Sequence, residues 1–302
     1  MKRSVGVFML VMGMVLLSGG CKGAKTTVVV GAKDFTEQDI LGNMLYLLIE
    51  AHTDIKVDYK HEMSSNVVFA AIKSGDIDLY IDYTGTVYGN YLGYSEMRSA
   101  EEVYDIAVKA LKDQYDLLML DPLGFNNTYT LSVRKDTAEH YGLKTYSDLA
   151  KVSQDLILGA TFEVLNRNDG IPNLKKAYGM SFKDEKAIDG TLRYTAMAKD
   201  EIQVTDAFST DGLLLEYDLM VLEDDRQFFP PYYAAPIIRA KTAEKYPELL
   251  NLLQRLSHIL DDEAMRELNY RVDVLKENPT ETARNFLKAR GLMPAPAAGS
   301  GT

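Results

Sequence analysis

The stretch TVVVGAKDFTEQDILGNMLYLLIE at residues 27–50 decides the fold class of this chain. Residues 27–31 form a β-branched run that ends in glycine, which is typical of a buried strand. Thr36 then opens a helix, because its hydroxyl can cap the first turn and Glu37 favours the positive end of the helix dipole. Apolar residues at helical spacing follow at 40–48. The stretch therefore predicts a strand, a polar loop and a helix.

The same alternation continues along the chain. Strands are expected at 55–59 and 77–80, with a helix between them that begins near 64–66. Strand, helix, strand, helix and strand in this order predict a parallel sheet with right-handed crossovers. The pattern repeats less clearly beyond Asn127, with strands expected at 129–133, 156–160 and 203–208 and a short helix at 174–178. Two prolines exclude helix near 228–235, and 243–291 is helical by its leucine spacing.

The N-terminus has the features of a secretory signal. Lys2 and Arg3 precede an apolar stretch at 5–17 that is too short to span a membrane comfortably, and small residues follow at 18–20. Cys21 comes next, and the arrangement resembles a bacterial lipobox, although its leucine lies one place further from the cysteine than usual. We therefore expect a lipoprotein signal peptide at 1–21 and a lipid anchor on Cys21. The alternative is an ordinary signal peptide with an incidental cysteine.

Composition excludes several classes of function. The chain has 302 residues, enough for two small domains, and its net charge of −11 argues against a nucleic-acid partner. Cys21 is the only cysteine, so no intramolecular disulfide can form. The four histidines lack metal-ligand spacing, and the glycines form neither a phosphate loop nor a dinucleotide turn. We expect no metal and no cofactor.

Three polar segments follow predicted strand ends, at 31–38, 75–86 and 124–129. Ligands of open α/β sheets bind at such positions. The sequences GAKDFTEQ at 31–38 and YTGT at 83–86 resemble the substrate-binding proteins of osmoprotectant ABC importers, which are receptors for glycine betaine, carnitine and choline. The similarity spans roughly residues 28–291.

The resemblance implies an α/β protein with the two-lobed, type II periplasmic-binding-protein-like fold. Each lobe would be a mixed sheet flanked by helices, with the ligand in the cleft between them. Lobe 1 would comprise 26–126 and 229–291, lobe 2 would comprise 127–228, and 292–302 would be a disordered tail. The resemblance also implies an extracytoplasmic monomer that delivers its ligand to an ABC permease in the membrane.

The resemblance further implies a binding site with two parts. An aromatic cage for a trimethylammonium group falls on Tyr83, Tyr129, Phe208 and Tyr232. Each ring contributes about 0.5–2 kcal/mol, so several are needed. Phe208 stands where the family often has tyrosine. The family positions that bind the carboxylate of a betaine match Lys33, Thr86 and Arg167 here. Asn127 would bridge the lobes. Two basic residues favour a carboxylated ligand such as glycine betaine over choline.

Several alternatives stay open at this level. Tyr233 competes with Tyr232 for the cage, and Arg167 would ordinarily pair with a neighbour such as Asp169. Tyr80, Tyr88 and Tyr91 are more typical of packing residues. Residues 63–65 depart from the family pattern, which keeps choline, carnitine or a bulkier trimethylated amino acid as alternative ligands. An extracytoplasmic enzyme is disfavoured because no nucleophile has a partner, and a scaffold lipoprotein would bind no small molecule.

Overall fold

The computed structural model describes residues 27–293 of the chain. The predicted signal peptide, Cys21 and most of the predicted tail lie outside these residues. Leu292, at the start of that tail, is buried, and its carbonyl oxygen lies 2.6 Å from His52 Nε2. Between residues 27 and 293, no helix is long and apolar enough to cross a membrane.

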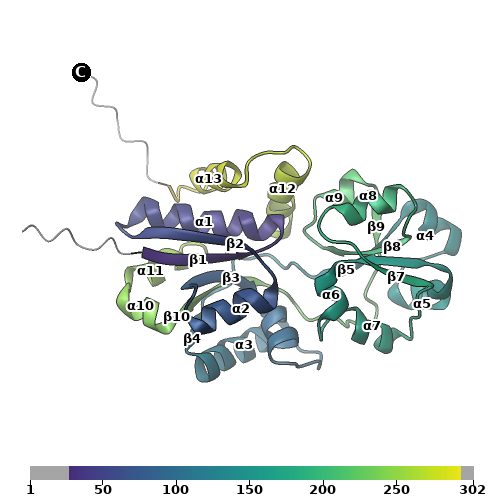
Figure 1. The fold of residues 1–302 in the computed structure, drawn as a ribbon, viewed down its shortest axis with the longest axis horizontal. Helices are drawn as coiled ribbons and strands as arrows, with labels where there is room; N and C mark the ends of the chain where they lie inside the picture. Colours follow the sequence, from purple (N-terminus) through teal and green to yellow (C-terminus); the bar gives the residue numbers. More distant parts are fainter. Residues whose placement is uncertain (1–26, 294–302) are drawn as a thin grey trace, which may run out of the picture.

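Lobe 1 is built on a five-stranded sheet of order β2-β1-β3-β10-β4 (Figure 1). β1 pairs in parallel with β2 and β3, as the alternation of strands and helices predicts. β10 comes from the far end of the chain and runs antiparallel between β3 and β4. The strands are β1 (Thr27–Lys33), β2 (Lys56–Met63), β3 (Leu79–Tyr83), β4 (Leu117–Met119) and β10 (Ala234–Arg239).

Helices cover the faces of this sheet. α1 is almost wholly buried, and its apolar stripe packs against β1, β2 and α13. The region 243–291 is helical as predicted, but it is divided into separate helices. The helices of lobe 1 are α1 (Thr36–His52), α2 (Ser65–Ser74), α3 (Ala100–Tyr115), α10 (Ala240–Lys245), α11 (Glu248–Gln254), α12 (Asp262–Asp273) and α13 (Pro279–Ala289), with a π-helical turn η1 (Thr86–Tyr91) after β3.

Lobe 2 has the same plan at smaller size, with a sheet of order β7-β6-β8-β5-β9. β6 pairs in parallel with β7 and β8, and β5 runs antiparallel to β8 and β9. The strands are β5 (Tyr129–Arg134), β6 (Ile157–Ala160), β7 (Asp184–Ala187), β8 (Val204–Phe208) and β9 (Leu219–Val221). The helices are α4 (Lys135–Tyr141), α5 (Tyr146–Val152), α6 (Phe162–Asn166), α7 (Ile171–Tyr178), α8 (Leu192–Ala198) and α9 (Leu213–Glu216), with a 3₁₀ turn η2 (Ser153–Asp155).

Two crossovers join the lobes, one from β4 to β5 and one from β9 to β10. They lie side by side, because Asn126 and Tyr233 form an isolated antiparallel bridge. The Asn127 amide donates to the Tyr232 carbonyl at 3.0 Å, and the Tyr232 amide donates to Asn126 Oδ1 at 2.7 Å. The connection between the lobes is therefore a short two-stranded ribbon.

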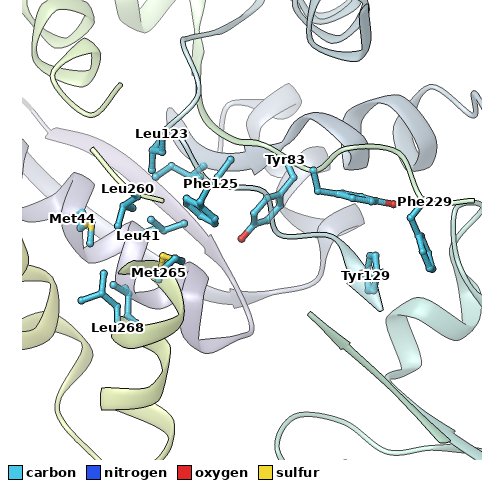
Figure 2. Close-up of a cluster of buried hydrophobic side chains, with 14 of the residues drawn as sticks. Leu41, Met44, Tyr83, Leu123, Phe125, Tyr129, Phe229, Leu260, Met265 and Leu268 are labelled. Atoms are coloured by element: carbon cyan, nitrogen blue, oxygen red, sulfur yellow. The ribbon is translucent and has the colours of Figure 1, made fainter. Parts of the chain in front are cut away.

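A hydrophobic cluster runs from the core of lobe 1 into the core of lobe 2. The part drawn in Figure 2 extends from Leu41 and Met265 past Phe125 and Tyr83 to Tyr129 and Phe229. Tyr83 lies at the end of β3, and Tyr129 opens β5. The aromatic side chains between the lobes thus rest on a continuous apolar base. The two mixed sheets, each flanked by helices, confirm the predicted fold class.

Candidate functional site

The two lobes enclose a cavity of about 150 Å³. Its lining comes from β1 and the loop after it, from β3 and η1, from both crossovers, and from α6 and β8. The structure brings all eight residues predicted for the ligand to this cavity: Lys33, Tyr83, Thr86, Asn127, Tyr129, Arg167, Phe208 and Tyr232.

Aromatic rings form a connected series around the cavity. The Tyr129 ring centroid lies 5.0 Å from that of Phe208 and 5.7 Å from that of Tyr232. Phe35 continues the series, at 5.2 Å from Phe208 and 6.4 Å from Tyr83. The rings come from both lobes, so they can close around a ligand from opposite sides.

Phe35 is an aromatic lining residue that sequence reasoning missed. It occupies the N-cap position of α1 with extended backbone, and its side chain is only partly buried. A single phenylalanine in a loop has no periodicity to identify it. Its position inside the segment 31–38 is the one signal that could have pointed to it.

Two of the three tyrosine rings are fixed by hydrogen bonds to carboxylates. The Tyr83 hydroxyl donates to Glu37 at 2.6 Å, and the Tyr232 hydroxyl donates to Asp169 Oδ2 at 2.7 Å. Phe208 has no hydroxyl, but its ring stacks on Phe35 and packs in a tilted arrangement against Tyr129. Packing therefore replaces the missing hydrogen bond at position 208.

The structure explains why position 85 of the YTGT sequence is a glycine. A Cβ atom at this position would lie 2.6 Å from Cδ1 of Tyr232, closer than van der Waals contact allows. Tyr232 is 1% exposed and lines the inner cavity, so a side chain at position 85 would displace its ring. The glycine lets the cage ring lie directly on the backbone after β3.

Lys33 is buried in an ion pair with Asp82, with Nζ 2.5 Å from Oδ1. Asp82 also accepts hydrogen bonds from the hydroxyls of Tyr80 at 2.7 Å and Tyr91 at 2.9 Å. Tyr80 and Tyr91 are thus packing residues that also hold the lysine's partner. Lys33 Nζ lies 5.1 Å from the Tyr83 ring centroid, so one of the two predicted basic residues borders the cage.

Arg167 lies between two carboxylates. Its Nε and Nη2 donate to the two oxygens of Asp169 at 2.8 and 2.7 Å, and Nη1 donates to Glu163 Oε1 at 2.8 Å. The remaining contacts of the guanidinium, to Ser65 Oγ and Thr86 Oγ1, are both 3.4 Å long. The pairing with Asp169 that the sequence left open is therefore present, and two N–H groups keep only weak partners.

Glu163 connects the lobes, and sequence reasoning missed it. Its Oε1 accepts a hydrogen bond of 2.5 Å from Ser65 Oγ at the start of α2. Burial acts to raise the pKa of Glu163, but the charges of Arg167 and Lys33 outweigh burial and leave this pKa below its ordinary value. Glu163 is therefore ionised at neutral pH. Ser65 belongs to the segment that departs from the family pattern.

Two more carboxylates, Asp34 and Asp189, stand at the mouth of the cavity. Within the described chain they form no ion pair. Burial and the negative charges of Glu163 and Asp189 raise the pKa of Asp34. The cavity therefore presents unneutralised negative charge on the side that opens to solvent.

Glu37 lies behind the cage and is 2% exposed. Besides the Tyr83 hydroxyl, it accepts hydrogen bonds from Asn127 Nδ2 at 2.7 Å, Asn269 Nδ2 at 3.1 Å and the hydroxyl of Thr210 in lobe 2 at 2.6 Å. Burial raises the pKa of Glu37, although these donors act to lower it. The sequence identified Glu37 only as a helix-dipole residue.

The cavity continues into a second compartment of about 410 Å³, lined by β1, α1, α12 and the segments around α8 and β8. Phe35, Asn127 and Phe208 line both spaces. We call them the inner and the outer compartment. Together they offer room for a ligand larger than a single trimethylammonium group with a short carboxylate arm.

The positions of two further tyrosines bear on the remaining sequence alternatives. Tyr232 lines the inner compartment, whereas Tyr233 lies in the bridge between the crossovers. Tyr88 is buried, and its hydroxyl donates to the Glu96 carbonyl.

Among residues 27–293, no group of three or more His, Cys, Asp or Glu side chains is placed to hold a metal ion.

Residues 26–289 match the protein family described as the substrate binding domain of ABC-type glycine betaine transport systems. The ergothioneine transport permease/ergothioneine binding protein EgtU of Helicobacter pylori is 39% identical over 266 residues, which are 88% of this chain but 48% of that protein. This chain thus spans about half the length of that relative. The carnitine transport binding protein OpuCC of Listeria monocytogenes is 34% identical, with 88% of this chain and 87% of the relative covered.

A solved structure has the same fold. The crystal structure of a glycine betaine/carnitine/choline ABC transporter protein superposes with a TM-score of 0.71 at 33% identity, covering 88% of this chain and 99% of that one. Both the sequence matches and this superposition extend over the two lobes, so they apply to the cleft as well as to the sheets.

Proposed function

This chain belongs to the family of substrate binding domains of ABC-type glycine betaine transport systems, and from that premise we propose that it binds a carboxylated quaternary ammonium compound between its lobes and delivers it to an ABC permease. The observation that carries the proposal is the series of five rings from both lobes around one cavity between them: Phe35, Tyr83, Tyr129, Phe208 and Tyr232. The family consists of extracytoplasmic transport proteins rather than enzymes.

The rings suit a trimethylammonium group because this cation has no hydrogen to donate. Aromatic faces attract its diffuse charge while its methyl groups pack against carbon, at about 0.5–2 kcal/mol for each ring. The hydrogen bonds from Tyr83 to Glu37 and from Tyr232 to Asp169 hold two rings in place before the ligand enters. Such preorganisation lowers the entropic cost of binding. Asp34 and Asp189 add negative charge at the entrance.

The ligand carboxylate is assigned to Arg167, Thr86 and Lys33. The two guanidinium N–H groups with weak partners, on Nη1 and Nη2, point toward the hydroxyls of Ser65 and Thr86. A carboxylate placed there would take two parallel hydrogen bonds from the arginine. Choline has no group to use these donors, which favours a betaine.

A bulkier betaine, such as a trimethylated histidine derivative, is the second candidate. Its support is the 39% identity to a protein named for binding ergothioneine, together with the outer compartment of about 410 Å³. Glycine betaine would leave that compartment empty.

The lobe boundaries, the monomeric state and the lipid anchor are part of the same proposal. Lobe 1 is placed at 26–126 and 229–291 and lobe 2 at 127–228, and the protein works as a monomer anchored through Cys21. Replacing Cys21 with Ala should release the protein from the membrane fraction.

Calorimetry and thermal unfolding of the purified protein test the proposal. Glycine betaine, carnitine, choline and histidine betaine form the panel, with proline as a control that lacks the trimethylammonium group. At a hundredfold excess over Kd, a ligand stabilises the protein by about 2.7 kcal/mol. Absence of heat and of stabilisation with every quaternary compound would contradict the proposed function.

A further inference from the structure

Glu163 is a carboxylate of the protein's own chain inside the site assigned to the ligand carboxylate. It lies in α6 and lines the inner compartment, and its side chain is 28% exposed, so a bound ligand meets it directly. Its Oε1 accepts a hydrogen bond from Arg167 Nη1 at 2.8 Å. Although burial acts to raise the pKa of Glu163, the charges of Arg167 and Lys33 lower it. Glu163 therefore uses the same two positive charges that a ligand carboxylate would need.

Arg167 has a complete partner even without Glu163. Both oxygens of Asp169 accept from it, at 2.8 Å from Nε and 2.7 Å from Nη2. One guanidinium thus pairs with two carboxylates, and this group of three side chains carries one more negative charge than positive. A ligand carboxylate on the remaining N–H groups would bring a third negative charge to a single positive one.

The position of Glu163 is held from both lobes. In lobe 1, Ser65 Oγ donates to Oε1 at 2.5 Å, and the Ser65 backbone amide donates to Oε2 at 3.3 Å. In lobe 2, Arg167 Nη1 is the third donor. A carboxylate with three donors stays in place when a ligand enters. It then shares Nη1 with the ligand carboxylate, within the ~4–6 Å over which like charges disfavour one another.

We propose that Glu163 is a specificity-determining residue that limits how much a carboxylate contributes to ligand binding. The inference rests on the proposed function and deepens it. Two charge-assisted hydrogen bonds to an uncompensated arginine correspond to about a hundredfold or more in Kd, and Glu163 offsets most of this gain. The quaternary ammonium group therefore carries most of the affinity, and an acid without an ammonium group is rejected.

A purely structural ion pair would behave differently. Glu163 and Arg167 are four residues apart, the spacing of an ordinary helix pair, and Glu163 also joins the lobes. If the pair served only the fold or the closure, its loss would weaken every ligand alike. The proposed role instead changes the ratio of affinities for two ligands of the same shape that differ in charge.

Glycine betaine, carnitine and histidine betaine, each compared with its own primary amide, test the inference by calorimetry on the purified protein. The amide keeps the quaternary ammonium group and the size of the carboxylate but has no negative charge. The unmodified protein should bind each carboxylate within about tenfold of its amide. A larger preference for the carboxylate would overturn the inference and leave the proposed function intact. Binding of none of these compounds would contradict both.

The variant Glu163→Gln assigns the effect to this carboxylate. Gln keeps the size and an acceptor oxygen for Ser65 but removes the negative charge beside Arg167, so the preference for the carboxylate over the amide should rise about tenfold or more. Glu185→Gln is the matched control. Glu185 lies in β7 of the same lobe, is 31% exposed and pairs with Lys175, but lines neither compartment.

A preference that is unchanged in Glu163→Gln, or that rises equally in Glu185→Gln, would refute the assignment. If Glu163→Gln does not fold, the comparison of carboxylates with amides on the unmodified protein still decides the proposal.

Discussion

The Arg167 guanidinium pairs with Asp169 and Glu163, and we propose that it also binds the ligand carboxylate. Replacing it with Ala removes the donors for a ligand carboxylate, so glycine betaine affinity should fall by about tenfold or more. Choline should lose less than about threefold, because Asp169 and Glu163 then add free negative charge near its ammonium group. Calorimetry with both ligands measures the difference.

The control for this variant is Arg134→Ala, which breaks ion pairs on the outside of lobe 2. Thermal unfolding should be recorded as well, since removing one partner of a buried pair costs about 3–5 kcal/mol of stability. Equal losses of affinity for glycine betaine and choline would contradict the carboxylate role of Arg167.

Glu37 makes stability depend on pH. Burial raises its folded-state pKa above the ordinary value of 4.5. Between 4.5 and the raised pKa, the folded protein binds more protons than the unfolded chain, so stability falls as pH rises through this window. Glu37→Gln should flatten that decline, as measured by denaturant unfolding from pH 4.5 upward. The exposed Glu281→Gln is the control, and an unchanged slope in Glu37→Gln would disprove the effect.

Individual site residues differed in how far the sequence could identify them. The eight predicted residues stand in short segments that resemble a known family, and the structure places all of them at one cavity. Nothing local marks Glu163, and the segment 31–38 does not by itself show that Phe35 and Glu37 border the cavity. Their roles depend on partners far away in the sequence, such as Asn127 for Glu37 and Ser65 for Glu163.

At the scale of elements, η1 begins where β3 ends, and Gly85 at this junction touches the Tyr232 ring. Gly85→Ala should displace that ring and weaken every trimethylammonium ligand by about tenfold, since one well-placed ring contributes about 0.5–2 kcal/mol and its displacement also disturbs its neighbours. Calorimetry with glycine betaine and choline gives the measurement.

Gly159→Ala is the control for Gly85→Ala. Its added Cβ would meet Ile202 inside lobe 2, at 2.3 Å from Cδ1, away from both compartments. It should lower the melting temperature without changing Kd. A Gly85→Ala protein with unchanged affinity would show that the ring does not contribute to binding.

Long, strongly patterned elements were predictable, and of the short strands only β6, expected at 156–160, was identified. The β-branched run of β1 and the apolar stripe of α1 appear where the sequence predicts them. β4, β7 and β9 have three or four residues each, too few to show alternation. The insertion of β10 between β3 and β4 depends on pairing across about 150 residues, which no local pattern contains.

At the scale of the whole molecule, several hydrogen bonds join the lobes across the cleft, including one from Arg266 to the Ser209 carbonyl at 3.0 Å. The two shortest join the Ser65 hydroxyl to Glu163 at 2.5 Å and the Thr210 hydroxyl to Glu37 at 2.6 Å. The double variant Ser65→Ala/Thr210→Val should shift the unliganded protein toward an open form, because each bond to a charged group contributes about 1.5–3 kcal/mol. Small-angle X-ray scattering should show a larger radius of gyration, which saturating ligand reduces again.

Thr242→Val is the matched control for closure, since it removes a hydrogen bond to Asp78 within lobe 1. The radius of gyration of Thr242→Val should equal that of the unmodified protein. A double variant that stays as compact as the unmodified protein would show that other contacts determine closure.

The paired crossovers carry side chains that line the inner cavity. Asn127 lies on one strand of the ribbon and Tyr232 on the other, joined by the hydrogen bond between their backbones. The residues proposed to recognise the substrate therefore also lie in the connection between the lobes. Under the proposed function, a substitution at either position that changes which ligand is bound should also change how readily the lobes open.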